Sequence, residues 1–245
     1  MSEQVVEVPM LNADQAAGWA ALLDLYESHP TGWTLVGGQM VHLWCAARGS
    51  WPTRATDDAD TVLDVRGHPD ALFQITSTLK AAGFAPAGTT HTGHQHRWVR
   101  DAAVIDVLIP RFLGEHAARR RGAGGGTTLE TPGAQKALNR TSAQAVKVEG
   151  RTGAVLRPSV LGALGAKAAA RTVMLDRKRD RHLTDFAVLS TLLTPADVRG
   201  EPPLDALERD RLRSMLGDMR AHRPVWAMVG GATAGLQRLE LLLRG

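Results

Sequence analysis

The sequence predicts an α/β (α+β) fold, in which a short mixed sheet with helices is followed by a C-terminal helical domain. Apolar runs of strand length alternate with helical stretches as far as residue 157, and from residue 159 onward the apolar spacing is mostly helical. The chain has 245 residues and 44% hydrophobic content, enough for a sizeable core. We therefore expect two domains, residues 1–157 and residues 158–245.

The first domain is predicted from alternating helices and strands. Asn12 is a candidate N-cap, and the segment Pro30-Thr31-Gly32 ends the helix that follows it. The predicted order is a helix at 12–28, a strand at 33–36, a helix at 39–47, a strand at 60–65 and a helix from 68 to about 83. Two hairpins follow, one pairing 96–99 with 102–109 and the other spanning 143–156 around Gly150. Between them, RRRGAGGGTT at 119–128 has the composition of a mobile loop.

The second domain is predicted to be helical. Ser159 is a candidate N-cap, and apolar residues then recur at helical spacing between prolines. The expected helices are 160 to about 175, 181–193, 204–222 and 225–243. We expect this domain to close over the sheet, with the site between them.

Charge and cysteine content restrict the function only a little. The 29 basic residues exceed the 25 acidic ones by a margin that agrees with a polyanionic partner but that many solvated surfaces share. Cys45 is the single cysteine, which predicts a buried structural thiol. The N-terminus lacks a secretory signal, and no stretch reaches the ~18 apolar residues of a membrane helix. We expect a cytoplasmic protein without a membrane partner.

A glycine pair separates the predicted strand at 33–36 from the helix at 39–47. Gly37 and Gly38 would let backbone N–H groups approach phosphate oxygens at the positive end of that helix. Because a Gly-Gly pair is usually only a turn, its interpretation depends on its neighbours.

Three aspartates complete this pattern. Asp58 and Asp60 are two residues apart, so on a strand they would point to one face and bind one hard cation. Asp106 interrupts the apolar run AVIDVLIP, where an unpartnered charge would be costly. Together they could bind Mg²⁺, or Mn²⁺, and orient a nucleoside triphosphate, with Asp106 also accepting the proton of the attacking group. The alternative for each feature alone is a solvated surface.

In this order, the Gly-Gly pair, the Asp-X-Asp pair and the distal Asp resemble the nucleotidyltransferase superfamily (polymerase-beta-like). Within it, VGGQMVHLW followed by RATDDAD is similar to the AbiEii-type toxins of toxin–antitoxin and phage-defence systems, with Arg54, Thr56, Asp58 and Asp60 in the pattern Arg-X-Thr-X-Asp-X-Asp. The resemblance implies transfer of a nucleoside monophosphate from a nucleoside triphosphate to an acceptor such as the 3′ end of tRNA, with release of pyrophosphate. It also implies a cognate antitoxin, and contacts from Arg54 and Thr56 to the nucleotide.

A second motif, Lys167-AAA-Arg171 followed by DRKRDRHLTDF, resembles the helical segment of those toxins. The resemblance implies that Lys167 and Arg171, four residues apart on one helix face, neutralise phosphate charge, and that Asp185 orients basic groups or the nucleotide. The chain departs from the family at His182, where an Asp is usual, with Asp180 two positions earlier. The alternative is a solvated basic helix.

Other functions remain open at this point. The acceptor could be an antibiotic, an aminoglycoside or lincosamide, although a basic rim with Arg119 to Arg121 and Arg177 to Arg181 favours RNA. A degenerate fold that only binds nucleotide, RNA or protein is the alternative of another class. The Arg119 to Arg121 run could equally be a flexible loop. His91, His94 and His96 lack further metal ligands at a recognisable spacing, which favours a polar turn over a metal site.

Overall fold

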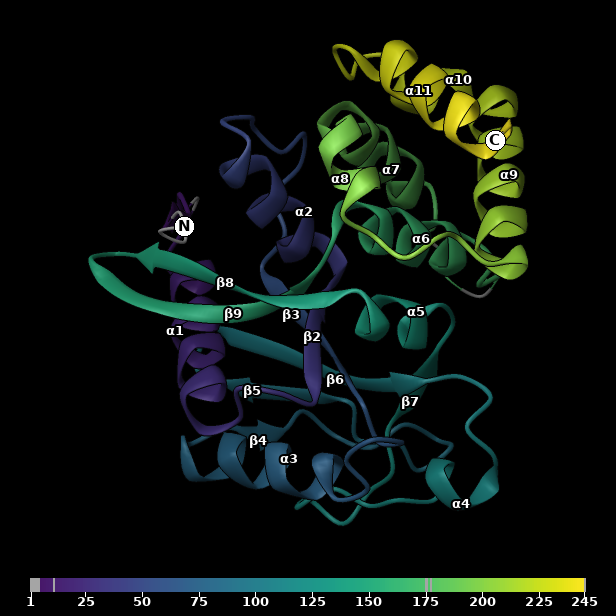
Figure 1. The fold of residues 1–245 in the computed structure, drawn as a ribbon. Helices are drawn as coiled ribbons and strands as arrows, with labels where there is room; N and C mark the ends of the chain where they lie inside the picture. Colours follow the sequence, from purple (N-terminus) through teal and green to yellow (C-terminus); the bar gives the residue numbers. More distant parts are fainter. Residues whose placement is uncertain (1–4, 11, 175, 177, 245) are drawn as a thin grey trace.

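The centre of the fold is a mixed sheet with the strand order β2-β3-β6-β5-β4 (Figure 1). The computed structural model describes residues 5–10, 12–174, 176 and 178–244. The strands of this sheet are β2 (Trp33–Val36), β3 (Asp58–Leu63), β4 (Ala85–Pro86), β5 (Arg97–Arg100), β6 (Ala103–Pro110) and the short β7 (Leu129–Thr131), which pairs with the end of β6. β3 is antiparallel to β2 and parallel to β6, whereas β5 is antiparallel to β6. The predicted mixed sheet is confirmed.

The register of β3, β5 and β6 decides where the acidic residues lie. Asp60 of β3 pairs with Asp106 of β6, and Arg97 of β5 pairs with the same Asp106 from the other side. Asp58 shares the face of Asp60 because side chains alternate along a strand. β3 begins at Asp58, two residues earlier than predicted, since its pairing with β6 extends back to Val104.

Helices surround this sheet, as Figure 1 shows. The Asn12 side chain accepts the N–H of Gln15 and caps α1, as predicted. α2 begins at Gly37, so the glycines form its first turn and do not precede it. Cys45 is fully buried in α2, and burial raises the pKa of its thiol to about 12, which confirms the prediction of a buried thiol. The helices are α1 (Ala13–Ser28), α2 (Gly37–Ala47), α3 (Ala71–Ala81), α4 (Glu115–Ala118) and α5 (Ala134–Asn139).

A second, three-stranded sheet has the order β1-β8-β9 and packs through β9 against α1 and β2. Its strands are β1 (Val6–Glu7), β8 (Thr141–Val148) and β9 (Arg151–Pro158). Glu149 and Gly150 join β8 to β9 with φ values of +46° and +86°. Two successive left-handed residues match the twist of a two-residue hairpin, and the predicted hairpin around Gly150 is confirmed.

The C-terminal part is helical and lies together at one end of the molecule (Figure 1). Ser159 caps α6 by accepting the N–H of Gly162, as predicted. α6 ends at Arg171, and residue 175, the predicted end, lies outside the described residues. Pro195 is in the first turn of α8, where its missing N–H costs no hydrogen bond. The helices are α6 (Val160–Arg171), α7 (Arg181–Leu192), α8 (Pro195–Arg199), α9 (Ala206–Ala221), α10 (Arg223–Trp226) and α11 (Ala232–Arg244).

Two aspects of this helical part bear on the predictions. The single helix expected at 225–243 is wrong, because Gly231 has φ +78°, outside the helical range, and separates α10 from α11.

The predicted boundary near residue 157 coincides with the end of β9, yet α2 packs against both α6 and α7 within one apolar core. The division into two domains therefore stays a prediction. None of the described helices is long and apolar enough to cross a membrane.

Candidate active site

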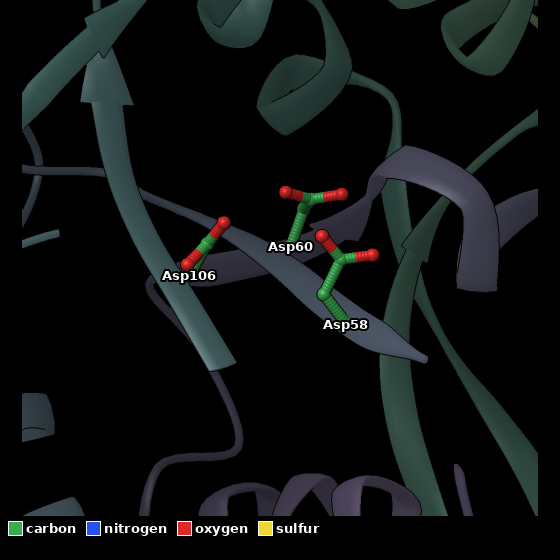
Figure 2. Close-up of side chains that lie close together, drawn as sticks. All are labelled: Asp58, Asp60 and Asp106. Carbon is green, nitrogen blue, oxygen red and sulfur yellow. The ribbon is translucent and has the colours of Figure 1, made fainter. Parts of the chain in front are cut away.

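Three carboxylates come together where β3 and β6 run side by side (Figure 2). Asp58 and Asp60 extend from β3 and Asp106 from β6, with one oxygen of each within 4.8 Å of the others. Asp106 is buried, whereas Asp58 and Asp60 are partly exposed. The structure therefore brings together the three acidic residues that the sequence singled out, and we refer to them as the acidic cluster.

The electrostatics of the acidic cluster favour a bound cation. Burial, followed by the charges of Asp58 and Asp106, raises the pKa of Asp60 to about 7. Carboxylates at this separation repel one another unless a positive charge lies near them. Carboxylate oxygens are the donors that Mg²⁺ and Mn²⁺ prefer, so the donor set fits such an ion, and these three aspartates would hold it.

The first turn of α2 lies against the acidic cluster and leaves no room for side chains. Gly37 has φ +69°, and a Cβ at this position would overlap the Asp60 carboxylate. A Cβ on Gly38 would lie 2.6 Å from Cγ2 of Thr56. No side chain caps this turn, so its N–H groups, at the positive end of the helix dipole, are available to an anion.

A cavity of about 310 Å³ adjoins the acidic cluster and the glycine turn. Its polar wall includes Asp58 and Asp60. Val62 and Leu108 are two residues beyond Asp60 and Asp106 on the same strands and belong to an apolar wall. The other apolar residues of that wall are Val36, Leu129, Pro132, Ala134, Ala166, Ala170 and Val173. The cavity therefore offers a surface for charged groups next to one for an apolar ring.

A buried ion-pair network stands beside this cavity. Arg54 donates through Nε and Nη2 to the two Asp185 oxygens at 3.0 and 2.8 Å, and Lys167 Nζ donates to Oδ2 at 2.7 Å. Burial alone would raise the pKa of Asp185, but Lys167 and Arg54 outweigh it and lower that pKa to about 2. Arg54, Lys167 and Thr56 line the cavity, and the Thr56 hydroxyl donates to Asp58 at 2.9 Å. Asp185 thus holds two basic groups in place.

Comparison with known proteins bears on the fold. No family model matches the chain, and no curated protein matches it. An antigenic nucleotidyltransferase-like protein from Paracoccidioides brasiliensis has a similar structure, with a TM-score of 0.51 and 14% identity over 88% of this chain and 93% of that protein. The chain has a nucleotidyltransferase-like fold. The solution structure of the antibiotic-resistance factor ANT(2'')-Ia has a TM-score of 0.45 and 14% identity over 87% of this chain and 98% of that one.

The nucleotidyltransferase-like fold confirms the predicted architecture, whereas the narrower resemblance to AbiEii-type toxins stays a prediction. One predicted site residue does not reach the cavity. Arg171 is buried and donates to Asp180 at 2.7 Å and to Asp218 at 3.0 Å. Its charge is therefore taken up by protein carboxylates away from the cavity lining.

His182, where the chain departs from the family pattern, lies in the cavity wall of this nucleotidyltransferase-like fold. Its Nε2 is 3.0 Å from Asp176 Oδ2. Burial, followed by Lys167 and Arg181, lowers the pKa of His182 to about 4, so the ring is neutral at pH 7 and donates to Asp176. Arg181 and Asp176 also line the cavity. The carboxylate beside His182 thus comes from Asp176 and not from Asp180. Arg181, unlike Arg171, is among the residues that line the cavity.

Sequence reasoning missed Arg97, which contacts the acidic cluster. Its Nε and Nη2 donate to the two Asp106 oxygens at 2.8 and 2.7 Å, and Nη2 lies 3.4 Å from Asp58 Oδ2. The signal was available, because a hairpin turning at Asp101 places residue 97 opposite residue 106.

Two weaker sequence features have local roles in the structure. His94 Nδ1 lies 2.9 Å from the Thr127 hydroxyl, and the groups of potential metal ligands among the described residues include none of the three histidines. The 119–128 loop, predicted to be mobile, is tied down, since Ala123 N–H donates to Thr76 at 2.8 Å. Arg120 donates to the carbonyl of Val65. These observations favour structural roles for both features.

Proposed function

We propose that this protein is a metal-dependent nucleotidyltransferase that transfers a nucleoside monophosphate from a nucleoside triphosphate to an acceptor and releases pyrophosphate. The observation that carries the proposal is the position of the acidic cluster against the open first turn of α2, at the edge of one cavity. Either feature alone is common in proteins. Side by side, they can hold a cation and the triphosphate that it coordinates.

Each side chain has a role in this proposal. The N–H groups of Gly37 and Gly38 bind phosphate oxygens, and Lys167 and Arg181 add positive charge around them. The apolar wall receives the base. Asp106, on the strand next to Asp58 and Asp60, accepts the proton of the attacking hydroxyl. A bound Mg²⁺ or Mn²⁺ would supply Lewis-acid stabilisation of the charge that develops on the transferred phosphoryl group.

We propose RNA, such as the 3′ end of tRNA, as the acceptor, and growth arrest countered by an antitoxin as the biological role. Arginines next to the cavity support a polyanionic acceptor. Arg111 lines the cavity, and its guanidinium lies 6.0 Å from the ring centroid of Phe112, a residue that is 78% exposed. Arg66 donates to the Phe112 carbonyl at 3.3 Å. An exposed aromatic ring flanked by guanidinium groups suits unpaired nucleotides. The toxin role rests on the sequence resemblance alone.

A transfer assay tests this proposal. The purified protein is incubated with total tRNA, Mg²⁺ and each of the four labelled nucleoside triphosphates in turn. We expect label on RNA with at least one nucleotide, and none with Asp58→Ala. Asp57→Ala is the matched control, because Asp57 is the adjacent carboxylate but is exposed and accepts from Asn12.

The other outcomes of the assay are informative. Label on an aminoglycoside or lincosamide, and not on RNA, would replace the acceptor and keep the chemistry. Equal transfer by the wild type and by Asp58→Ala would contradict the enzyme proposal. Triphosphate binding without transfer to any acceptor would favour the degenerate fold.

A further inference from the structure

Arg97 makes a different kind of ion pair from the buried ones elsewhere in the molecule. It forks across both oxygens of Asp106, the buried member of the acidic cluster, at 2.8 and 2.7 Å. Its side chain is nevertheless 45% exposed, whereas Lys167 and Asp185 are 4% and 3% exposed. Its further contact with Asp58 is long, at 3.4 Å. Arg97 therefore holds Asp106 from the solvent side and has room to move away.

This bidentate interaction between Arg97 and Asp106, referred to below as the fork, divides the acidic cluster into two parts. Each oxygen of Asp106 already accepts a hydrogen bond from Arg97, so a cation that binds Asp106 meets a guanidinium charge on the same carboxylate. Asp58 has one oxygen bonded to the Thr56 hydroxyl at 2.9 Å and the other only loosely contacted. Asp58 and Asp60 on β3 are thus open to a cation, whereas Asp106 on β6 is already paired with Arg97.

We propose that Arg97 is a built-in counter-cation of the acidic cluster, which a divalent metal ion must displace before it can use Asp106. The inference rests on the proposed function, because it takes the acidic cluster to be a metal site. Arg97 neutralises part of the cluster while no metal is bound and, by the same charge, weakens metal binding. Binding of a metal ion to Asp106 is therefore coupled to release of the Arg97 guanidinium.

Charge and geometry support this competition over a purely structural role. Solvent screens the half-exposed guanidinium of Arg97, so its pair with Asp106 contributes less to stability than a pair in which both groups are buried. The same guanidinium lies a few ångströms from any cation bound by the cluster. Even if the interaction is screened as in bulk water, with a dielectric constant of about 80, removing one such positive charge strengthens binding of a divalent cation by at least about tenfold.

Metal titration tests the proposal without relying on activity. Mn²⁺ binding to the full chain is measured by calorimetry for the wild type, Arg97→Gln and Arg100→Gln. Arg100 is the matched control, because it lies on the same strand but stacks on Phe84 and donates to the Ala82 carbonyl at 2.7 Å. We expect Arg97→Gln to bind Mn²⁺ at least about tenfold more tightly than the wild type, and Arg100→Gln to match the wild type.

A double-mutant cycle tests whether the gain in Mn²⁺ affinity depends on the interaction between Arg97 and Asp106. In an Asp106→Asn background, the Arg97→Gln change should give clearly less gain, because Arg97 no longer faces a charged Asp106. Should Arg97→Gln fail to fold, Arg97→Lys provides the test, since it keeps the charge but loses the fork and should bind Mn²⁺ more tightly than the wild type by a smaller factor.

The outcomes separate this inference from the proposed function. If the wild type binds Mn²⁺ and transfers nucleotide, and Arg97→Gln binds Mn²⁺ with the same affinity as the wild type, the counter-cation proposal is wrong and the enzyme proposal stands. Weaker binding by Arg97→Gln also overturns it, because Arg97 would then support the metal site. Absence of Mn²⁺ binding in both proteins overturns the metal site and the inference together.

Discussion

Two groups of charged side chains near the cavity differ in how their charges are balanced. Asp185 is buried and accepts hydrogen bonds from two basic groups, Arg54 and Lys167. The acidic cluster has three carboxylates and a half-exposed Arg97 beside them. In the first group two cations more than balance one carboxylate, so Asp185 is fully paired, whereas the second group has more carboxylates than cations and keeps surplus negative charge. Fixed ion pairs position side chains, and surplus charge binds ligands.

The largest expected effect comes from removing surplus charge. Asp60→Asn should lower nucleotidyl transfer roughly a thousandfold, as expected for loss of a group that stabilises transition-state charge in a preorganised site. Its melting temperature in EDTA should not fall, because the substitution relieves repulsion with Asp58 and Asp106. Transfer assays and thermal melts of Asp60→Asn and the Asp57→Asn control check both effects. A marked loss of stability in EDTA would contradict the surplus-charge interpretation.

Breaking the ion pairs of Asp185 with Arg54 and Lys167 should lower the stability of the protein. Lys167→Met removes one of the two cations that hold Asp185, and we expect unfolding to become easier by about 3 kcal/mol, the cost of uncovering a buried charge. Urea denaturation measures the change, with exposed Lys80→Met as the control. An effect below about 1 kcal/mol, the size typical of exposed pairs, would show that Asp185 is not dependent on Lys167.

The two groups should respond to pH in opposite directions. The pKa of Asp60 is raised to about 7, so its protonated form favours folding, and without metal this contribution is lost as the pH rises from about 4 through 7. The pKa of Asp185 is lowered to about 2, so its contribution is present above its ordinary pKa near 4 and is lost as the pH falls toward 2. Between pH 5 and 8 in EDTA, the melting temperature of the wild type should therefore fall relative to that of Asp60→Asn as the pH rises, because only the wild type carries the Asp60 contribution. Parallel pH profiles of the two proteins would show that Asp60 does not contribute to the pH dependence of stability.

The parts of the site that the sequence predicts correctly depend on short-range geometry. Strand alternation places Asp58 and Asp60 on one face, and one hairpin puts Asp106 on a neighbouring strand. The ion pair of Arg171 with Asp218 of α9 could not be predicted, because four-residue spacing fixes a helix face but does not say what packs there. Asp176 lies outside the helices, between α6 and α7, where no periodicity exists to reveal it.

The smallest expected effect separates the two arginines of this region. Arg181 lines the cavity with a side chain 42% exposed, so Arg181→Gln should raise the KM for the nucleoside triphosphate about tenfold, equivalent to about 1.4 kcal/mol, with little change in stability. Arg171→Met should do the reverse. Its guanidinium is paired with Asp180 and Asp218, so we expect a stability loss of about 2 kcal/mol and a KM within about twofold of the wild type.

Steady-state kinetics and urea denaturation of both variants measure this contrast. A raised KM in Arg171→Met, at unchanged stability, would return Arg171 to the phosphate-binding role that the family resemblance implies. It would also mean that α6 reorients when nucleotide binds, because in the present arrangement protein carboxylates take up the charge of Arg171. An Asp218→Asn variant distinguishes these cases. It should weaken folding if the ion pair is structural, and lower the KM if Asp218 competes with phosphate for the guanidinium.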